Sequence, residues 1–251
     1  MERNLKLKKF GLIGKDISYS FSKRYFENKF LDNKYKSYSY ENFDLENISD
    51  VVNVFKIDNL SGLNVTIPYK EKIIPYLDEL TTRASKIGAV NTIIFRNKKK
   101  IGDNTDVIGF ENAMKAFIKP LLKKAIILGS GGASKAIQFV LKNSDIAFIV
   151  ASRNPNKDQI KYIDLNEKLI NEYPIIINCT PLGTFPKIEF YPKIPYENLS
   201  SKNYLIDLIY NPKKTEFMKK GIKNGAKVSN GYLMLIQQAE ASWKLWETSI
   251  I

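Results

Sequence analysis

The sequence predicts an α/β fold built of two domains, and three observations predict it. Strand-like and helix-like stretches alternate through the first hundred residues, as they do in a βαβ unit. A glycine turn then follows a continuous apolar run and precedes an amphipathic helix. Later apolar runs each end in a polar turn, which is typical of parallel strands covered on both faces.

The first domain should contain a short strand, a helix and further strands. The apolar run 9–14 is the first strand, and residues 20–32 place aromatic side chains at helical spacing. An alternating stretch at 34–43 predicts the next strand, and two strand-like runs separated by a basic turn lie within 89–106. Together these stretches predict an α/β domain.

The stretch LNVTIPYKEK places a lysine just beyond a predicted strand. Val65, Thr66 and Ile67 are β-branched, and Pro68 ends the strand because proline cannot donate to a ladder. Ligands in open α/β folds bind outside the carboxyl ends of parallel strands. Lys70 is therefore a candidate functional residue.

The second domain begins with a helix predicted at 104–117, for which Asn104 or Thr105 is the expected N-cap. Residues 123–143 read as a strand, a glycine turn and a helix. The remaining elements are apolar strands within 145–154, 173–183 and 203–212 and a long helix at 230–246.

Composition narrows the function classes. The 251 residues are 44% hydrophobic and 26% charged, as in an ordinary globular protein, and no apolar run approaches the ~20 residues that span a bilayer. The basic N-terminus has no long apolar region of a signal peptide, so we expect a cytoplasmic protein without a membrane partner. The net charge of +13 comes from lysines spread along the chain, which does not favour a nucleic-acid partner.

Histidine is absent and Cys179 is the single cysteine. An internal disulfide, the usual zinc sites and nucleophile systems that need imidazole are thereby excluded, and we expect no metal. Lysine, tyrosine and carboxylate side chains remain as proton carriers. We expect Cys179 to be a small buried residue at a strand end, without a chemical role.

The glycine turn has the context of a dinucleotide-binding fingerprint, with an ordinary tight turn as the alternative. Glycines let the backbone approach a pyrophosphate, which free amides at the helix N-terminus then bind. The next strand ends without a carboxylate, and basic side chains there favour the 2′-phosphate of NADP over NAD. The predicted cofactor-binding residues of these two segments are Gly129, Ser130, Gly131, Gly132, Ala133, Ser152, Arg153, Asn154 and Lys157.

Motifs in a fixed order along nearly the whole chain resemble the shikimate dehydrogenase family. They are Ser20-Phe-Ser22, Asn64-Val-Thr66-Ile-Pro68-Tyr-Lys70, Gly88-Ala-Val-Asn91-Thr92, Asp103-Asn-Thr-Asp106, the glycine turn, Asn178-Cys-Thr-Pro-Leu-Gly183, Asp207-Leu-Ile-Tyr210-Asn-Pro212, and the segment from Asn230 to Gln238-Ala239. The resemblance implies NADP-dependent interconversion of 3-dehydroshikimate and shikimate, a step in aromatic amino-acid biosynthesis.

The resemblance also implies roles for single residues. Lys70 and Asp106 correspond to the catalytic pair, and Asp106 either relays a proton or only orients the lysine and binds a substrate hydroxyl. The implied substrate-binding residues are Ser20, Ser22, Thr66, Lys70, Asn91, Asp106, Tyr210 and Gln238, of which Tyr210 is equally consistent with a core aromatic. Thr180 and Gly231 are added to the cofactor-binding set.

The family pattern implies a discontinuous arrangement. Residues 1–103 plus 230–251 would form the substrate-binding and catalytic domain, and 104–229 a Rossmann-like, doubly wound NADP-binding domain, with a cleft between them. We expect a monomer or homodimer acting on a small molecule. Tyr19, Lys23 and Val107 depart from the family's usual histidine, proline and glycine.

Two other functions stay open. One is a relative that oxidises quinate as well as shikimate with NAD, for which an acidic residue near Ser152 would be expected. The other is a non-catalytic protein on the same scaffold that senses a ligand or binds nucleic acid. The intact Lys70 and Asp106 argue against it, because a sensor needs no proton donor.

Overall fold

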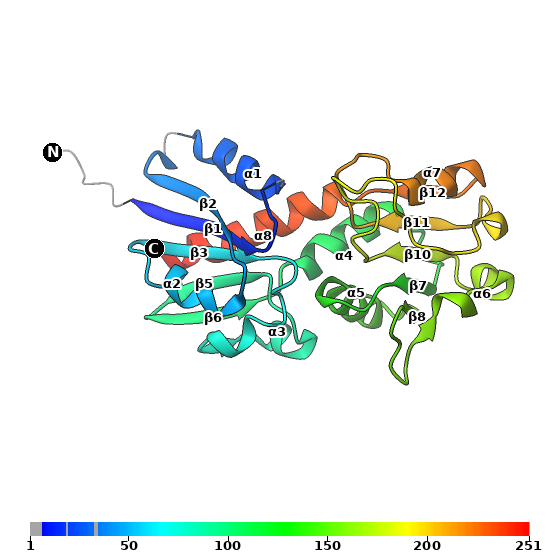
Figure 1. Ribbon diagram of the computed structural model, residues 1–251, viewed down its shortest axis with the longest axis horizontal. Coiled ribbons are helices and arrows are strands. Elements are labelled where there is room, and N and C mark those ends of the chain that lie inside the picture. The colour runs from blue at the N-terminus through cyan, green and yellow to red at the C-terminus, as the bar shows by residue number, and fades with distance from the viewer. Residues whose placement is uncertain (1–6, 19, 33–34, 251) are drawn as a thin grey trace. The chain divides into compact units, whose positions relative to one another are not determined.

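The computed structural model describes residues 7–18, 20–32 and 35–250. Tyr19, which replaces the family's usual histidine, lies outside the described residues. The chain forms two compact units, one of residues 1–105 with 239–251 and one of residues 106–238 (Figure 1). Each unit holds its own six-stranded sheet, so the predicted α/β fold class is confirmed.

The sheet of the first unit is mixed. β1 pairs in parallel with β2 and β3, β5 is antiparallel to both of its neighbours, and β4 pairs in parallel with β6. In sheet order the strands are β2 (Tyr38–Asp44), β1 (Lys8–Gly14), β3 (Leu60–Val65), β5 (Thr92–Arg96), β6 (Lys99–Asp103) and β4 (Glu79–Leu80).

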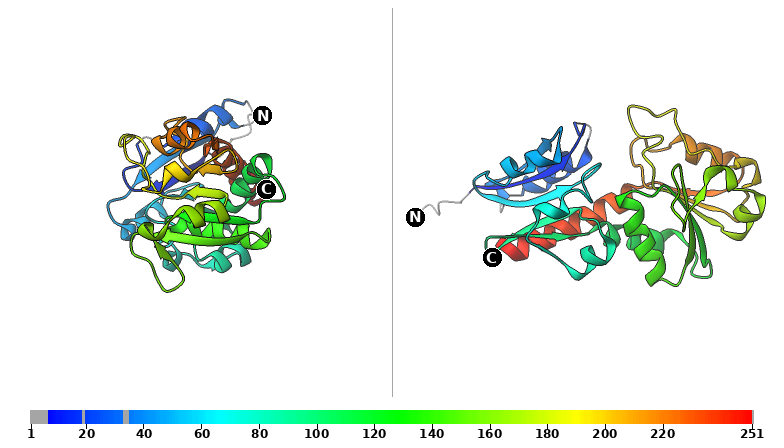
Figure 2. Two further views of the ribbon diagram at one scale, coloured as in Figure 1. Left: turned by 90° about the vertical axis from the view of Figure 1, so that its right-hand side faces the viewer. Right: turned by 60° about the horizontal axis from the view of Figure 1, so that its bottom comes forward.

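Helices cover both faces of this sheet. On one face α1 (Phe21–Phe30) and the later turns of α8 (Tyr232–Ile250) bury an aromatic cluster that includes Phe10, Phe26 and Trp246. Figure 2 shows α8, in red, beside this sheet. The other face is covered by η2 (Ile48–Asp50), α2 (Val51–Val54), η3 (Ile74–Tyr76) and α3 (Thr82–Ile87).

Local signals explain where two of these helices begin. The Ser20 hydroxyl accepts a hydrogen bond from the Ser22 amide at 3.3 Å and caps α1. The Thr81 hydroxyl caps α3 in the same way through the Ala84 amide, and α3 ends at Gly88, whose positive φ of 68° suits glycine. Both caps are residues that the helix N-terminus favours.

The sheet of the second unit is entirely parallel. Its strand order places β7 in the middle, with later strands added first on one side and then on the other, which is the doubly wound order of a Rossmann-like fold. In sheet order the strands are β12 (Lys227–Ser229), β11 (Tyr204–Asp207), β10 (Ile175–Asn178), β7 (Lys124–Leu128), β8 (Ala147–Ser152) and β9 (Ile160–Lys161).

β10 and β11 are buried along their whole length, and β7 is buried after its first residue, as their apolar sequences predict. One face packs on α6, η5 and α7, and α5 packs on β7 and β8 beside α4. The helices of this unit are α4 (Asp106–Phe117), α5 (Gly132–Asn143), η4 (Tyr162–Asp164), α6 (Glu167–Glu172), η5 (Tyr196–Asn198), α7 (Glu216–Lys223) and the first turns of α8.

The boundaries of the units differ from the predicted domain boundaries by a few residues. The first unit extends to residue 105, and the final helix is divided after residue 238 instead of belonging wholly to the first domain. The physical reason is the close packing of α8 on α4: a Cβ at Gly109 would lie 2.5 Å from the carbonyl of Met234 and 3.0 Å from Cβ of Gln238. The first turns of α8 therefore pack with the second unit.

Candidate active site

Lys70 lies in the loop after β3, as the sequence predicts, but the strand ends at Val65 and does not include Thr66 and Ile67 as expected. The preceding residue, Tyr69, is buried, and its hydroxyl donates hydrogen bonds to the carbonyls of Leu45 at 2.6 Å and Glu46 at 3.0 Å. The Lys70 carbonyl accepts the Val90 amide at 2.7 Å. These hydrogen bonds fix the loop at Tyr69 and at the backbone of the partly buried Lys70.

Asn91 links this loop to the segment that carries Asp106. Asn91 follows Val90 directly and is 3% exposed. Its side-chain oxygen accepts the Thr105 amide at 2.7 Å, and its side-chain nitrogen donates to the Thr105 hydroxyl at 3.0 Å. Thr105 precedes Asp106, the first residue of α4, where the helix dipole favours a carboxylate.

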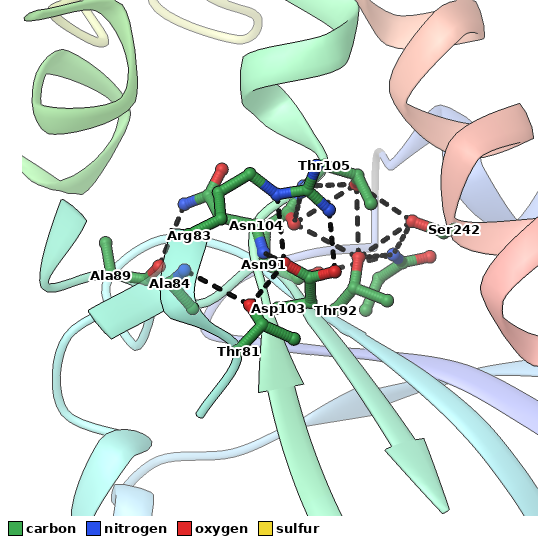
Figure 3. Close-up of polar contacts among 11 residues, drawn as sticks. Thr81, Arg83, Ala84, Ala89, Asn91, Thr92, Asp103, Asn104, Thr105 and Ser242 are labelled. Atoms are coloured by element: carbon green, nitrogen blue, oxygen red, sulfur yellow. Dashed lines mark hydrogen bonds and ion pairs between the residues drawn. The ribbon is translucent and has the colours of Figure 1, made fainter. Parts of the chain in front are cut away.

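The Thr105 hydroxyl forms hydrogen bonds with residues of the first unit. That hydroxyl lies 3.1 Å from the Thr92 hydroxyl and 3.0 Å from the Ser242 hydroxyl. Asn64, of the asparagine-containing motif that includes Lys70, donates to Ser242 at 3.0 Å and accepts from the Tyr40 hydroxyl at 2.8 Å. Figure 3 shows the part of this network around Asn91 and Thr105.

The network reaches the serines at the start of α1. Ser22 is buried, and its hydroxyl lies beside Tyr40, whose pKa is raised well above its ordinary value by burial and lowered in part by this hydrogen bond. Ser20 caps α1 and is partly buried. Because the Ser20 oxygen accepts a backbone amide, its hydroxyl proton is directed elsewhere and is suited to donate to an anion. The first turn of α1 holds no acidic residue.

An ion pair between a partly exposed arginine and a buried aspartate holds the strand end before Asp106. Asp103 is 2% exposed at the end of β6, and Arg83 of α3 contacts both of its carboxylate oxygens, through Nε at 3.0 Å and Nη2 at 2.6 Å. The Thr81 hydroxyl and the Asn104 amide also donate to the Asp103 carboxylate, each at 2.7 Å. Figure 3 shows Asp103 with Arg83, Thr81 and Asn104.

Thr66 and Gln238 lie on two different units. Thr66 is partly buried, and its methyl carbon would lie 2.7 Å from a Cβ at Gly14, at the end of β1. Gln238 lies on α8 beside Gly109, which is one turn along α4 from Asp106, and its side chain donates to the Leu235 carbonyl at 3.0 Å.

The glycine turn in the second unit fits a dinucleotide. Gly129 follows β7 with a φ of 102°, which favours glycine, and Gly131 is the N-cap of α5. A Cβ at Gly131 would meet no atom within 4 Å, so the space in front of the helix is open. The first turn of α5 has no acidic residue, and its amides with the helix dipole favour a phosphate group. Gly132 and Ala133 begin this helix.

The end of β8 lies against the glycine turn, as the predicted fingerprint requires. The hydroxyls of Ser130 and Ser152 are 3.0 Å apart. The next residues, Arg153, Asn154 and Lys157, are exposed. No carboxylate takes the Ser152 position, where an NAD ribose would be held, so this edge of the sheet fits the phosphate-bearing cofactor.

Thr180 completes this edge of the sheet. Its methyl carbon would lie 3.0 Å from a Cβ at Gly129. The Asn178 side chain holds Thr180 by accepting its amide at 3.0 Å and its hydroxyl at 2.6 Å. β7 and β10 are the neighbouring strands at which the strand order reverses, the place where doubly wound sheets bind ligands.

A buried carboxylate lies behind the Thr180 loop. Asp207 at the end of β11 accepts hydrogen bonds from Asn178 at 3.0 Å, the Ile209 amide at 3.1 Å and the Thr215 hydroxyl at 2.5 Å. Burial raises the pKa of Asp207 to about 6 despite these bonds. Burial of the thiol and the nearby Asp207 also raise the pKa of Cys179, which favours the protonated thiol; the residue as a whole is partly exposed and not buried as expected.

Tyr210 lies in the loop after β11, and Gly231, between β12 and α8, packs against that loop. Tyr210 is partly buried just beyond β11. A Cβ at Gly231 would lie 2.0 Å from the Leu208 carbonyl oxygen, and the Gly231 amide donates to the Ile209 carbonyl at 3.0 Å. The structure thus gives Gly231 a packing role that its predicted place among the cofactor-binding residues did not include.

Sequence reasoning assigned no role to several residues that organise this site. They are Tyr40, Arg83, Asp103 and Ser242, and Asn64, which was quoted only as part of a motif. Asn64 and Asp103 belong to motifs of the sequence, and this membership is a signal that could have identified them. Tyr40, Arg83 and Ser242 carry no local signal, because their partners lie 20 or more residues away in the sequence.

Within residues 7–18, 20–32 and 35–250, no helix is long and apolar enough to cross a membrane. In the same part of the chain, no group of three or more cysteine, aspartate or glutamate side chains is placed to hold a metal ion.

Comparisons with known proteins identify the family. Residues 12–93 match the family model described as the shikimate dehydrogenase substrate binding domain. A shikimate dehydrogenase (NADP(+)) of Methanococcus maripaludis is 40% identical over 259 residues, covering 97% of this chain and 93% of the relative.

Solved structures agree. A crystal structure of a shikimate dehydrogenase in complex with NADP+ has a TM-score of 0.86 at 35% identity, covering 96% of this chain and 90% of that one. One from Thermus thermophilus, in complex with NADP(H) and shikimate, has a TM-score of 0.82 at 27% identity, covering 96% and 94%. The predicted enzyme class and NADP as cofactor are confirmed by these relatives. The chain belongs to the shikimate dehydrogenase family.

Proposed function

We propose that the chain catalyses the reversible, NADP-dependent reduction of 3-dehydroshikimate to shikimate, with Lys70 and Asp106 as its catalytic pair. One observation carries the assignment of the pair. Lys70 is bonded through its carbonyl to Val90, and the next residue, Asn91, holds the amide of Thr105, which precedes Asp106. Two hydrogen bonds thus connect the backbone of the lysine to that of the aspartate.

The proposed chemistry needs a proton donor at the substrate oxygen. Reduction of a ketone places negative charge on that oxygen, and an ammonium both stabilises this charge and supplies the proton. Lys70 is the residue proposed for this step. The proposed task of Asp106, at the start of α4, is to orient the ammonium and accept a hydrogen bond from a ring hydroxyl.

The substrate carboxylate is proposed to bind at the start of α1. The hydroxyls of Ser20 and Ser22 provide neutral donors there, and the positive end of the helix favours an anion, with Thr66 just beyond the end of β3 as a further proposed contact. Asn91, Tyr210 and Gln238 are proposed to contact the ring and its hydroxyls. Neutral donors suit a small anion because they fix its orientation without binding the product too tightly.

NADP is proposed to bind at the glycine turn and the end of β8. Residues 129–133 would receive the pyrophosphate, Arg153 and Lys157 the 2′-phosphate, with Ser152, Asn154 and Thr180 around them. When bound, the cofactor supplies or accepts a hydride. The proposed domains remain residues 1–103 plus 230–251 for the substrate and 104–229 for NADP.

The alternative activity, oxidation of quinate with NAD, is disfavoured because no carboxylate lies at Ser152. A purely sensing or nucleic-acid-binding protein would not need Lys70 and Asp106. A cytoplasmic monomer or homodimer without a nucleic-acid partner remains our prediction.

The test is a spectrophotometric assay of the purified chain at 340 nm with shikimate or quinate, each with NADP or NAD. We expect the highest kcat/KM with shikimate and NADP. Lys70→Ala should lower kcat by about 10²- to 10⁴-fold with NADPH binding nearly unchanged. Lys72→Ala, an exposed lysine two residues away, is the matched control and should keep full activity. An active Lys70→Ala enzyme would contradict the assigned role, and an inactive wild-type chain would contradict the function.

A further inference from the structure

We propose that Arg83 and Asp103 are positioning residues for this reaction: their ion pair, in which the carboxylate is buried, holds the backbone of residues 103–105, from which Asp106 extends. The inference rests on the proposed catalytic role of Asp106. Neither residue is assigned to substrate or cofactor, and both lie in the first unit, on α3 and at the end of β6.

The contacts of Asp103 are those of a fixed carboxylate. It is 2% exposed, and the guanidinium of Arg83 reaches both of its oxygens, at 3.0 and 2.6 Å. The Thr81 hydroxyl and the Asn104 amide add two bonds at 2.7 Å. The planar guanidinium makes a two-point contact that fixes the orientation of a carboxylate, which a lysine ammonium does not.

Each following residue is then held by a separate hydrogen bond. The Asn104 side chain donates to the Ala89 carbonyl at 2.9 Å, and the Thr105 amide donates to the Asn91 side chain at 2.7 Å. The Asn91 amide in turn donates to the Asp103 carbonyl at 3.1 Å. The strand end carrying Asp103 and the residue Asn91 therefore fix each other.

Loss of the Arg83 guanidinium would disturb this arrangement. A buried carboxylate without its cation is strongly unfavourable, so loss of Arg83 favours rotation of Asp103 toward solvent. Such a rotation breaks its bond to the Asn104 amide and loosens the segment before Asp106. A displacement of about 1 Å at a reacting group is enough to lower a rate by roughly 100-fold.

The experiment compares Arg83→Ala, Arg83→Lys and a control, Asp78→Asn. Asp78 forms an ion pair with Lys100 on the same strand β6, at 2.7 Å, but is exposed and distant in sequence from the catalytic segment. We expect Arg83→Ala to lower kcat by about 10- to 100-fold with the KM for NADPH within about twofold of wild type. Arg83→Lys should recover only part of kcat, and Asp78→Asn should match wild type.

Two measurements separate positioning from general destabilisation. Arg83 is partly exposed, so ethylguanidinium should reach the space left in Arg83→Ala and restore part of kcat. Hydrogen exchange of the Asn104 and Thr105 amides, measured without substrate, should be at least about tenfold faster in Arg83→Ala and unchanged in Asp78→Asn.

Full activity of Arg83→Ala, full recovery by lysine, or unchanged exchange at these two amides would each overturn the proposal. The exchange result needs no activity, so it tests the ion pair even if the wild-type chain proves inactive toward shikimate. Faster exchange with unchanged kcat would leave the ion pair as a structural feature and refute its positioning role.

Discussion

Asp207 should make the stability of this protein depend on pH in a direction opposite to that of an ion-paired aspartate, whose pKa is lowered on folding. Burial raises its pKa from 3.8 to about 6, although Thr215, Ile209 and Asn178 all donate to it. In the unfolded chain the carboxyl ionises near 3.8, whereas in the folded protein it keeps its proton until about pH 6. Between these values the folded state binds one more proton, so the free energy of unfolding falls as pH rises.

The size of the effect follows from the two pKa values. Each pH unit between 3.8 and about 6 lowers the free energy of unfolding by about 1.36 kcal/mol. Asp207 therefore makes the protein about 3 kcal/mol less stable above pH 6 than below pH 4. Asp207→Asn removes this titration while it keeps an acceptor for Asn178 and a donor for Thr215. The stability of wild type relative to Asp207→Asn should therefore fall by about 3 kcal/mol across this range.

Urea unfolding of both proteins at several pH values between 4 and 7.5 measures this difference. Asp78→Asn is a control of opposite sign, because Lys100 lowers the pKa of Asp78, and the stability that this pair contributes is lost as pH falls. A difference between wild type and Asp207→Asn that does not change with pH would refute the reasoning, as would a carboxyl NMR titration of Asp207 with a midpoint near 3.8.

Two further predictions concern the cofactor. Arg153→Ala should raise the KM for NADPH by about tenfold, because it removes one charge-assisted hydrogen bond to the 2′-phosphate. The KM for NADH should rise far less. Equal effects on the two KM values in steady-state assays would contradict the cofactor assignment. Gly131→Ala should raise the KM for NADPH at unchanged stability, because its Cβ meets no protein atom. Gly231→Ala, whose Cβ would lie 2.0 Å from the Leu208 oxygen, should instead destabilise by roughly 1–3 kcal/mol or more in thermal unfolding.

Much of the second unit was predictable because its signals are local. The apolar run before Gly129 and the amphipathic helix after it became β7 and α5 as expected. The expected strands within 145–154, 173–183 and 203–212 became β8, β10 and β11. Each depends on the periodicity and turn chemistry of neighbouring residues, which a single sequence displays.

The division of the last helix was not predictable in the same way. The helix at 230–246 was expected and is present as α8. Its division between the two units depends on the absence of a side chain at Gly109, which lets the helix backbone approach α4 closely. A glycine inside a helical pattern does not by itself reveal what will pack against it.

The amino-acid sequence by itself determined the order of the elements, the glycine turn and the family, because these depend on residue types at fixed short spacing. Only the tertiary structure paired Arg83 with Asp103, joined Asn64 to Ser242 and buried Asp207 enough to raise its pKa. Such contacts join residues up to 178 positions apart. Their geometry depends on how whole sheets and helices pack, and no local pattern encodes it.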